Sequence, residues 1–245
     1  MNWTDHRVLV TGGTRGIGRE LVQGLIARGA TVWATGRTPT STDRAAQQLP
    51  AARWLACDIA APEAPAQLSA LVQREAITAV IHNAGVQELR DFTRDAADET
   101  LSHAEEIAIN LQAPIDISRA VLPALRERPG AAIVFITSGL ALAPKQSSPI
   151  YCATKAGLRF FAKALRAQMR THGWPVRIVE VLPPIVDTDM TRGRGSRKLS
   201  ATEAARQTLD GIARGRDEVY VGASRLLKVI LLLSPALGER IMIQR

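Results

Sequence analysis

Tyr151 and Lys155, four residues apart, are side chains of this 245-residue chain whose types and spacing suit catalysis. They open an amphipathic stretch, so in a helix they share one face. A tyrosine can give a proton to an oxygen that gains negative charge, but the reverse step needs phenolate, which an ordinary pKa of about 10 disfavours. A neighbouring ammonium lowers that pKa by favouring the charged form. Ser138 ends an apolar run thirteen residues before Tyr151 and adds a hydroxyl. The three side chains suit chemistry at a carbonyl or an alcohol.

A glycine-rich segment at 11–18, with the sequence TGGTRGIG, is the second feature with chemical meaning. It lies between an apolar run and an amphipathic stretch at about 16–28. Glycines allow a sharp turn and a close backbone approach, and free N–H groups at a helix start attract an anion. A strand, this turn and a helix in that order predict a site for a dinucleotide pyrophosphate.

The residues after the second apolar run, at 31–35, bear on the choice of dinucleotide. An NAD site has an acidic residue there for the ribose 2′-hydroxyl, whereas this chain has Arg37 and no acid before Asp43. A guanidinium can pair with a 2′-phosphate through charge-assisted hydrogen bonds. We therefore expect NADP (NADPH) as the cofactor.

Short β-rich runs that alternate with helical patterns must position these groups. Seven strands are predicted, at 7–11, 31–35, 53–57, 79–82, 132–137, 176–182 and 219–221, with loops at 39–43, 138–149 and 183–200. The alternation implies one α/β domain over 1–245, a Rossmann-type doubly wound parallel sheet of seven strands with helices on both faces. Ligands of such sheets bind outside the carboxyl ends of the strands, where the motifs fall.

Together these motifs resemble the short-chain dehydrogenase/reductase family, whose signatures TGxxxGxG and YxxxK match residues 11–18 and 151–155. Residues 82–85, HNAG, are similar to the family's NNAG, and His82 in place of Asn is expected to be a hydrogen-bonded loop residue. The resemblance implies that Tyr151 is the acid and base, Lys155 lowers its pKa and binds the nicotinamide ribose, and Ser138 holds the substrate oxygen. It also implies that Asn110 supports a water leading to Lys155.

The same resemblance extends to the cofactor contacts. It implies that Asp58 holds the adenine ring, that Arg15 joins Arg37 at the 2′-phosphate, and that residues 183–188 form the nicotinamide-side loop. Pro184 stands there in place of the more usual glycine. The predicted cofactor-binding residues are Gly12, Thr14, Arg15, Gly16, Ile17, Gly18, Arg37, Asp58, Ile59, Asn83, Ala84, Gly85, Tyr151, Lys155, Pro184, Val186 and Thr188.

The implied activity is NADP-dependent hydride transfer between NADPH and a small ketone or aldehyde, or the corresponding alcohol. Two alternatives stay open: a non-enzymatic NADP-sensing regulatory or scaffold protein, and an epimerase or dehydratase, each on this fold.

Stretches at 137–141, 149–156 and 182–190 resemble bacterial short-chain oxidoreductases grouped with D-alanine esterification of teichoic acids. Membership of this group does not identify the substrate of the protein. The two cysteines and the histidines lack metal-ligand spacing, so no metal is expected.

The formal charge of +8 raises the question of an anionic partner. Eleven Lys and Arg against five Asp and Glu place most of the excess between Met190 and Arg245. No nucleic-acid-binding motif accompanies the charge, so a solvated face and cofactor phosphate contacts are expected instead of nucleic acid.

A basic mobile lid is predicted at about 188–200, where the charge either stays solvated or favours an anionic or carrier-linked substrate. Apolar cleft walls are predicted at Leu140, Leu142, Ile150 and Val186.

The C-terminal tail, at about 223–245, contains a strongly apolar run at 226–233 that is too short to span a bilayer. We expect it to be buried at the interface of a homodimer or homotetramer. Peripheral contact with a membrane surface, supported by its basic residues, is the second interpretation. The first residues form neither a signal peptide nor a membrane span, and the expected location is the cytoplasm.

Overall fold

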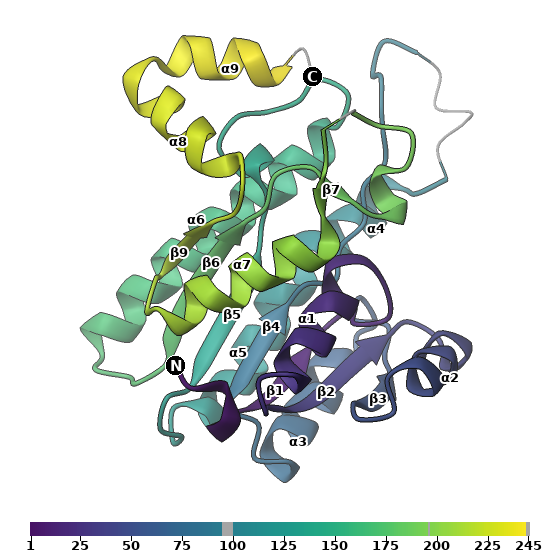
Figure 1. Cartoon of the computed structure of the whole chain (residues 1–245), viewed down its shortest axis with the longest axis vertical. Coiled ribbons are helices and arrows are strands. Elements are labelled where there is room, and N and C mark those ends of the chain that lie inside the picture. The colour runs from purple at the N-terminus through teal and green to yellow at the C-terminus, as the bar shows by residue number, and fades with distance from the viewer. Residues whose placement is uncertain (95–99, 196, 244–245) are drawn as a thin grey trace.

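The computed structural model describes residues 1–94, 100–195 and 197–243, and a parallel sheet of seven strands forms its centre (Figure 1). The strand order is β3-β2-β1-β4-β5-β6-β9, and all neighbouring strands run parallel. Ligands of doubly wound sheets bind where the order reverses, here between β1 and β4. The strands are β1 (Arg7–Val10), β2 (Thr31–Gly36), β3 (Arg53–Ala56), β4 (Ala79–His82), β5 (Ala132–Ile136), β6 (Arg177–Leu182) and β9 (Glu218–Tyr220). The predicted fold class is confirmed.

Helices cover both faces of this sheet. One face carries α1 (Gly16–Ile26) and α7 (Ala201–Ala213), which lie in front of the sheet in Figure 1. The opposite face carries α3 (Ala64–Arg74), α5 (Ala113–Leu125) and α6 (Pro149–Thr171).

The sheet is buried on both faces because its strands are continuous runs of small and branched apolar residues. In β1, Val8 and Val10 pack toward α1 and α7, while Leu9 packs toward the opposite helices, as the two-residue period of a strand requires. All residues of β4 and β5 are buried. This core fixes the carboxyl ends of the strands, and with them the loops that follow.

The predicted loop at 39–43 is wrong, because α2 (Pro39–Gln48) begins there. The Thr38 side chain accepts a hydrogen bond from the backbone N–H of Ser41 at 3.3 Å. Pro39 occupies the first helical turn, where its missing N–H costs nothing. A threonine cap followed by proline is a helix-start signal in the sequence.

The two longer predicted loops contain short regular elements. A 3-10 turn, η4 (Gly139–Ala141), lies between β5 and α6. The segment 183–200 contains β7 (Val186–Asp187), η5 (Asp189–Thr191) and β8 (Leu199–Ser200), and β7 and β8 pair in a second, parallel sheet. Ser196 lies outside the described residues, and the mobility of this segment stays a prediction.

The apolar tail folds into two helices, α8 (Ser224–Leu233) and α9 (Pro235–Ile243), beyond the carboxyl edge of the sheet (yellow in Figure 1). They pack closely: a Cβ atom at Gly238 would lie 2.4 Å from Cδ2 of Leu231. Leu232 and Leu233 are 74% and 82% exposed. Gln244 and Arg245 lie outside the described residues. Within the described ranges, no helix is long and apolar enough to cross a membrane.

Candidate active site

A cavity of about 1470 Å³ at the carboxyl ends of the strands contains both the glycine-rich turn and the predicted catalytic side chains. It exceeds the roughly 300–1,000 Å³ of a site for one small molecule, which leaves room for a dinucleotide and a second compound. Every residue predicted to bind the cofactor lines its wall, and so does Ser138. Asn110 does not. The roles of these residues stay predictions.

Helix α6 places Tyr151 and Lys155 in the cavity, one turn apart. The Lys155 Nζ atom donates a hydrogen bond to the carbonyl oxygen of Ile136, the last residue of β5, at 3.0 Å. The same atom lies 5.6 Å from the centre of the Tyr151 ring. Burial penalises the charged form and lowers the pKa of Lys155 to about 8. At neutral pH this side chain is therefore still mainly an ammonium.

Tyr151 and Ser138 form the hydroxyl pair of the site. Burial raises the pKa of Tyr151 to about 12, while its hydrogen bond with Ser138 and the charge of Arg194 act in the lowering direction. Burial therefore outweighs the lowering of the Tyr151 pKa that we expected from the Lys155 ammonium. The Ser138 side chain caps η4 by accepting a hydrogen bond from the Leu140 N–H at 3.1 Å. The phenol is thus a fixed, protonated acid near neutral pH.

Asn110 is fully buried behind the cavity wall. It belongs to η3 (Ala108–Gln112), a π-helical turn between α4 (His103–Ile107) and α5. Its side chain accepts a hydrogen bond from the Val86 N–H at 2.9 Å and donates one to the Val86 carbonyl at 2.8 Å. A Cβ atom at Gly85 would lie 3.1 Å from Asn110 Oδ1 and 3.5 Å from Lys155 Nζ. Asn110 and Lys155 therefore flank the same glycine.

The glycine-rich turn fits a close backbone approach to a phosphate. Gly12 has φ +66°, and a Cβ atom there would lie 2.8 Å from the Ala84 backbone. A Cβ atom at Gly18 would lie 2.1 Å from the Gly12 carbonyl oxygen. No side chain caps the start of α1, so its first N–H groups remain available to an anion. These residues fit a dinucleotide.

Asn83 joins the turn to the end of β4. Its side-chain NH₂ donates to the carbonyl oxygens of Thr11 at 3.0 Å and Gly12 at 2.9 Å. The hydroxyl of Thr11 accepts from the N–H of Asn83 at 3.1 Å and of Ala84 at 3.2 Å. The two strands at the switch point are thereby held in one arrangement.

Arg15 and Arg37 are exposed side chains at the β1–β2 end of the cavity. In the described part of the chain neither forms an ion pair, so both can pair with a phosphate group. Asp58 lines the cavity nearby, and its carboxylate accepts from the Ala60 N–H at 3.1 Å. Thr188 lies beside the same glycine-rich turn, with its Cγ2 atom 3.2 Å from where a Cβ of Gly16 would be.

His82 is buried at the end of β4. Its Nε2 atom lies 3.0 Å from the Ser118 hydroxyl, and its ring stacks on Phe135 at 5.1 Å between centroids. Burial lowers the pKa of His82 to about 3, so the imidazole is neutral. It does not line the cavity, which agrees with the structural role expected for it, although it ends a strand instead of lying in a loop.

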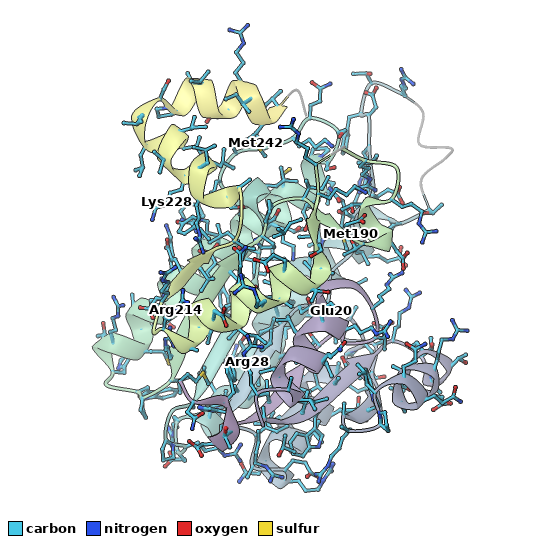
Figure 2. The ribbon with its side chains drawn as sticks, in the orientation of Figure 1. Glu20, Arg28, Met190, Arg214, Lys228 and Met242 are labelled. Atoms are coloured by element: carbon cyan, nitrogen blue, oxygen red, sulfur yellow. The ribbon has the colours of Figure 1, made fainter. Side chains whose placement is uncertain are left out.

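The rest of the cavity wall was only partly predicted. Leu140 and Val186 line it, whereas Leu142 and Ile150 do not. Figure 2 shows Met242, from α9, at the end of the molecule where the tail hairpin lies, and Met190, from η5, lower in the view. Sequence reasoning did not name these further lining residues: Gln87, Lys145, Met190, Arg194, Leu227 and Met242. The basic composition of 188–200 was a signal for Arg194, but no sequence signal indicated that the tail returns to the cavity.

Comparison with known proteins gives consistent relatives. The profile of the short chain dehydrogenase family matches residues 6–199. An uncharacterized oxidoreductase, DltE, of Bacillus subtilis (strain 168) is 37% identical over 89% of this chain and 89% of its own length. L-xylulose reductase of Homo sapiens is 31% identical, over 93% of this chain and 88% of its own. The DltE match confirms the predicted similarity to bacterial short-chain oxidoreductases.

A solved structure supports the same conclusion. A short chain dehydrogenase from Burkholderia cenocepacia J2315, determined in complex with NADP, superimposes with a TM-score of 0.87 at 26% identity, and each chain is covered completely. The matched residues include the glycine-rich turn, Ser138, Tyr151 and Lys155. The chain belongs to the short-chain dehydrogenase family of oxidoreductases.

Proposed function

We propose that this protein transfers a hydride between NADPH and a small ketone or aldehyde, or the corresponding alcohol. One observation carries the proposal: the glycine-rich turn and the Ser138, Tyr151 and Lys155 side chains face the same cavity. NADPH, when bound, supplies the hydride. A non-enzymatic NADP-sensing protein on this fold would not require these three side chains together.

Tyr151 would give its proton to the substrate oxygen, because it is a protonated, half-buried acid held by Ser138. Ser138 would donate or accept a hydrogen bond at the same oxygen. Lys155, mainly charged at neutral pH, would stabilise the phenolate left behind and bind the ribose of the cofactor. Asn110, held by Val86, would support a water that returns a proton toward Lys155.

NADP is the preferred cofactor in this proposal because Arg37 follows β2 where an NAD site needs an acid. Arg15 and Arg37 both line the cavity without an ion-pair partner in the described part of the chain. A 2′-phosphate would supply the missing negative charge. The NADP complex of the Burkholderia cenocepacia relative supports this choice.

The test is a panel of ketones, aldehydes and cyclic imines, monitored by NADPH absorbance. Tyr151→Phe should abolish turnover and leave NADPH binding, measured by titration, nearly unchanged, because it removes a proton donor and little volume. Substantial residual turnover in this variant would contradict the mechanism. Product formed without a stoichiometric change in NADPH would indicate an epimerase or dehydratase. NADPH binding without turnover of any compound would favour the regulatory alternative.

The exposed apolar face of the tail hairpin, formed by α8 and α9, fits a second copy of the chain, as a homodimer or homotetramer. Leu226, Val229, Leu232, Leu233 and Leu237 are each about half exposed or more. Several exposed large apolar side chains on two adjacent helices are unusual on a monomer. Binding to an anionic membrane surface is the alternative outcome of the same test, described in the Discussion.

A further inference from the structure

The half of the cavity around Tyr151 is built from segments far apart in the sequence. The strand order places Arg37 and Asp58, which follow β2 and β3, on one side of the switch point, and β5, β6 and β9 on the other. Lys145 follows β5, Arg194 follows η5, and the tail hairpin adds Leu227 and Met242. These four residues, which we call the substrate end, are not among those predicted to bind the cofactor.

The substrate end has an excess of positive charge. Lys145 and Arg194 are half-buried, and neither forms an ion pair with any residue of the described ranges. The two acids of the neighbouring loop are already paired, Asp187 with Lys198 at 3.3 Å and Asp189 with Arg192. A cation that is partly removed from water without a counter-ion is unfavourable, and an anionic ligand would relieve this.

Arg194 is held in place by a neutral group. Its Nη1 atom donates to the Gln87 side-chain oxygen at 2.7 Å, and the Gln87 NH₂ donates to the buried hydroxyl of Ser148 at 2.9 Å. An amide leaves the charge of the guanidinium uncompensated, and a guanidinium has five N–H donors. The guanidinium also lies close enough to Tyr151 for its charge to act on the pKa of that phenol. It is therefore oriented and near the reacting oxygen.

We propose that the substrate is a carbonyl compound that carries a carboxylate, which Arg194 and Lys145 bind while the carbonyl oxygen lies at Ser138 and Tyr151. A planar guanidinium pairs with a carboxylate through two parallel hydrogen bonds, and the ammonium of Lys145 adds a second charge. Leu140, Leu227 and Met242 give the carbon chain an apolar wall. This inference rests on the proposed carbonyl chemistry and narrows it to keto acids.

The test compares keto acids with their methyl esters, which lack the charge to be recognised and carry one additional methyl group. Suitable pairs are benzoylformate, acetoacetate and 4-oxopentanoate with their esters, which vary the distance between the carbonyl and the carboxylate. A hydrogen bond to a charged group changes affinity by about tenfold to a hundredfold. In the wild-type protein, kcat/KM should be at least about tenfold higher for one acid than for its ester.

Arg194→Gln and Lys145→Met should each reduce the acid-to-ester ratio by about tenfold or more. Arg214→Gln is the control, because this arginine at the end of α7 is exposed, does not line the cavity, forms no ion pair within the described ranges, and should leave the ratio unchanged. Loss of the Arg194 charge also changes the pKa of Tyr151, but that effect is common to acid and ester and cancels in the ratio. The pH profile measures it separately.

The outcomes separate this inference from the proposed function. Turnover of esters as fast as acids, or an unchanged ratio in Arg194→Gln, would overturn the inference and leave the NADPH-dependent reaction intact. Without turnover of either class the proposed function fails, and calorimetric titration of the NADP⁺-loaded protein with pentanoate and pentanamide decides the inference. Tighter binding of pentanoate, lost in Arg194→Gln but not in Arg214→Gln, would support it. Equal binding of the two compounds, or no binding, would overturn it.

Discussion

Replacement of Arg159 by methionine should destabilise the protein strongly, because it leaves a buried carboxylate without its partner. Arg159 lies two turns after Tyr151 on α6, and its guanidinium pairs with Glu180 of β6, which is 0% exposed. Burial disfavours the charged form of Arg159, but the hydrogen bond and charge of Glu180 outweigh it and raise the arginine's pKa. Thr137, next to Ser138, donates to the other oxygen of Glu180 at 2.9 Å.

Breaking a buried ion pair by removing one partner costs about 3–5 kcal/mol, far more than loss of a surface pair. With a urea m-value of about 2–3 kcal/mol/M, the unfolding midpoint should fall by about 1–2.5 M. Urea unfolding followed by circular dichroism measures this shift. Arg206→Met is the control, since Arg206 pairs with Glu203 at 2.6 Å on the exposed face of α7 and should change the midpoint little.

A double variant tests the cause. If the uncompensated charge of Glu180 is responsible, Glu180→Gln in the Arg159→Met background should restore a large part of the lost stability, although it adds a second substitution. The amide can still accept the hydrogen bond from Thr137. A midpoint for Arg159→Met within about 0.3 M of wild type, or a double variant less stable than Arg159→Met alone, would refute the reasoning.

Three further expectations concern the cofactor site, the buried lysine and the tail. In the wild-type protein, kcat/KM with NADPH should exceed kcat/KM with NADH. Arg37→Ser should lower the ratio of these two values by about tenfold, because a charge-assisted hydrogen bond is lost. Equal or NADH-favouring values in the wild type would contradict the cofactor assignment. The pKa of Lys155 is lowered from 10.5 to about 8. Between these pH values the unfolded chain binds the proton that the folded chain lacks. The free energy of unfolding of the wild type relative to that of Lys155→Met should therefore rise with pH by about 3 kcal/mol. A difference between the two proteins that does not change with pH, measured by urea unfolding, would count against this expectation. Leu232→Ser with Leu233→Ser should reduce the mass in solution if the tail is a subunit interface, whereas loss of co-sedimentation with anionic vesicles would indicate a membrane surface.

The cavity wall around the glycine-rich turn could be predicted from the sequence because its chemistry is local. A strand, a glycine-rich turn and a helix are consecutive in the chain, and each conformational requirement falls on a neighbouring residue, as Gly12 and Gly18 show. The strand positions could also be predicted from the sequence, because the continuous apolar runs of buried parallel strands differ from the amphipathic helices between them. The start of α2 was missed although Thr38 and Pro39 signal it.

The substrate half could not be predicted, because it depends on contacts between distant segments. Nothing in the apolar run at 226–233 indicates that Leu227 faces the cavity while Leu232 faces solvent. Asn110 was placed by resemblance, but the π-helical turn that hides its side chain behind the wall has no clear signal in the sequence. An acid within the apolar pattern of β6 was visible at Glu180, but its partner on α6 was not.

Tyr220, at the end of β9, connects the catalytic helix to the tail without lining the cavity. Its hydroxyl accepts a hydrogen bond from Arg159 of α6 at 3.4 Å, and Lys228 of α8 lies 4.3 Å from the centre of its ring. Arg225 donates to its carbonyl oxygen at 2.8 Å. Helix α6, which carries Tyr151, and the tail hairpin, which forms part of the cavity wall, therefore both contact the Tyr220 side chain. The glycine-rich turn is held separately, through the hydrogen bonds of Asn83, so we expect substitutions in the tail hairpin to alter the cavity around Tyr151 and to leave that turn in its arrangement.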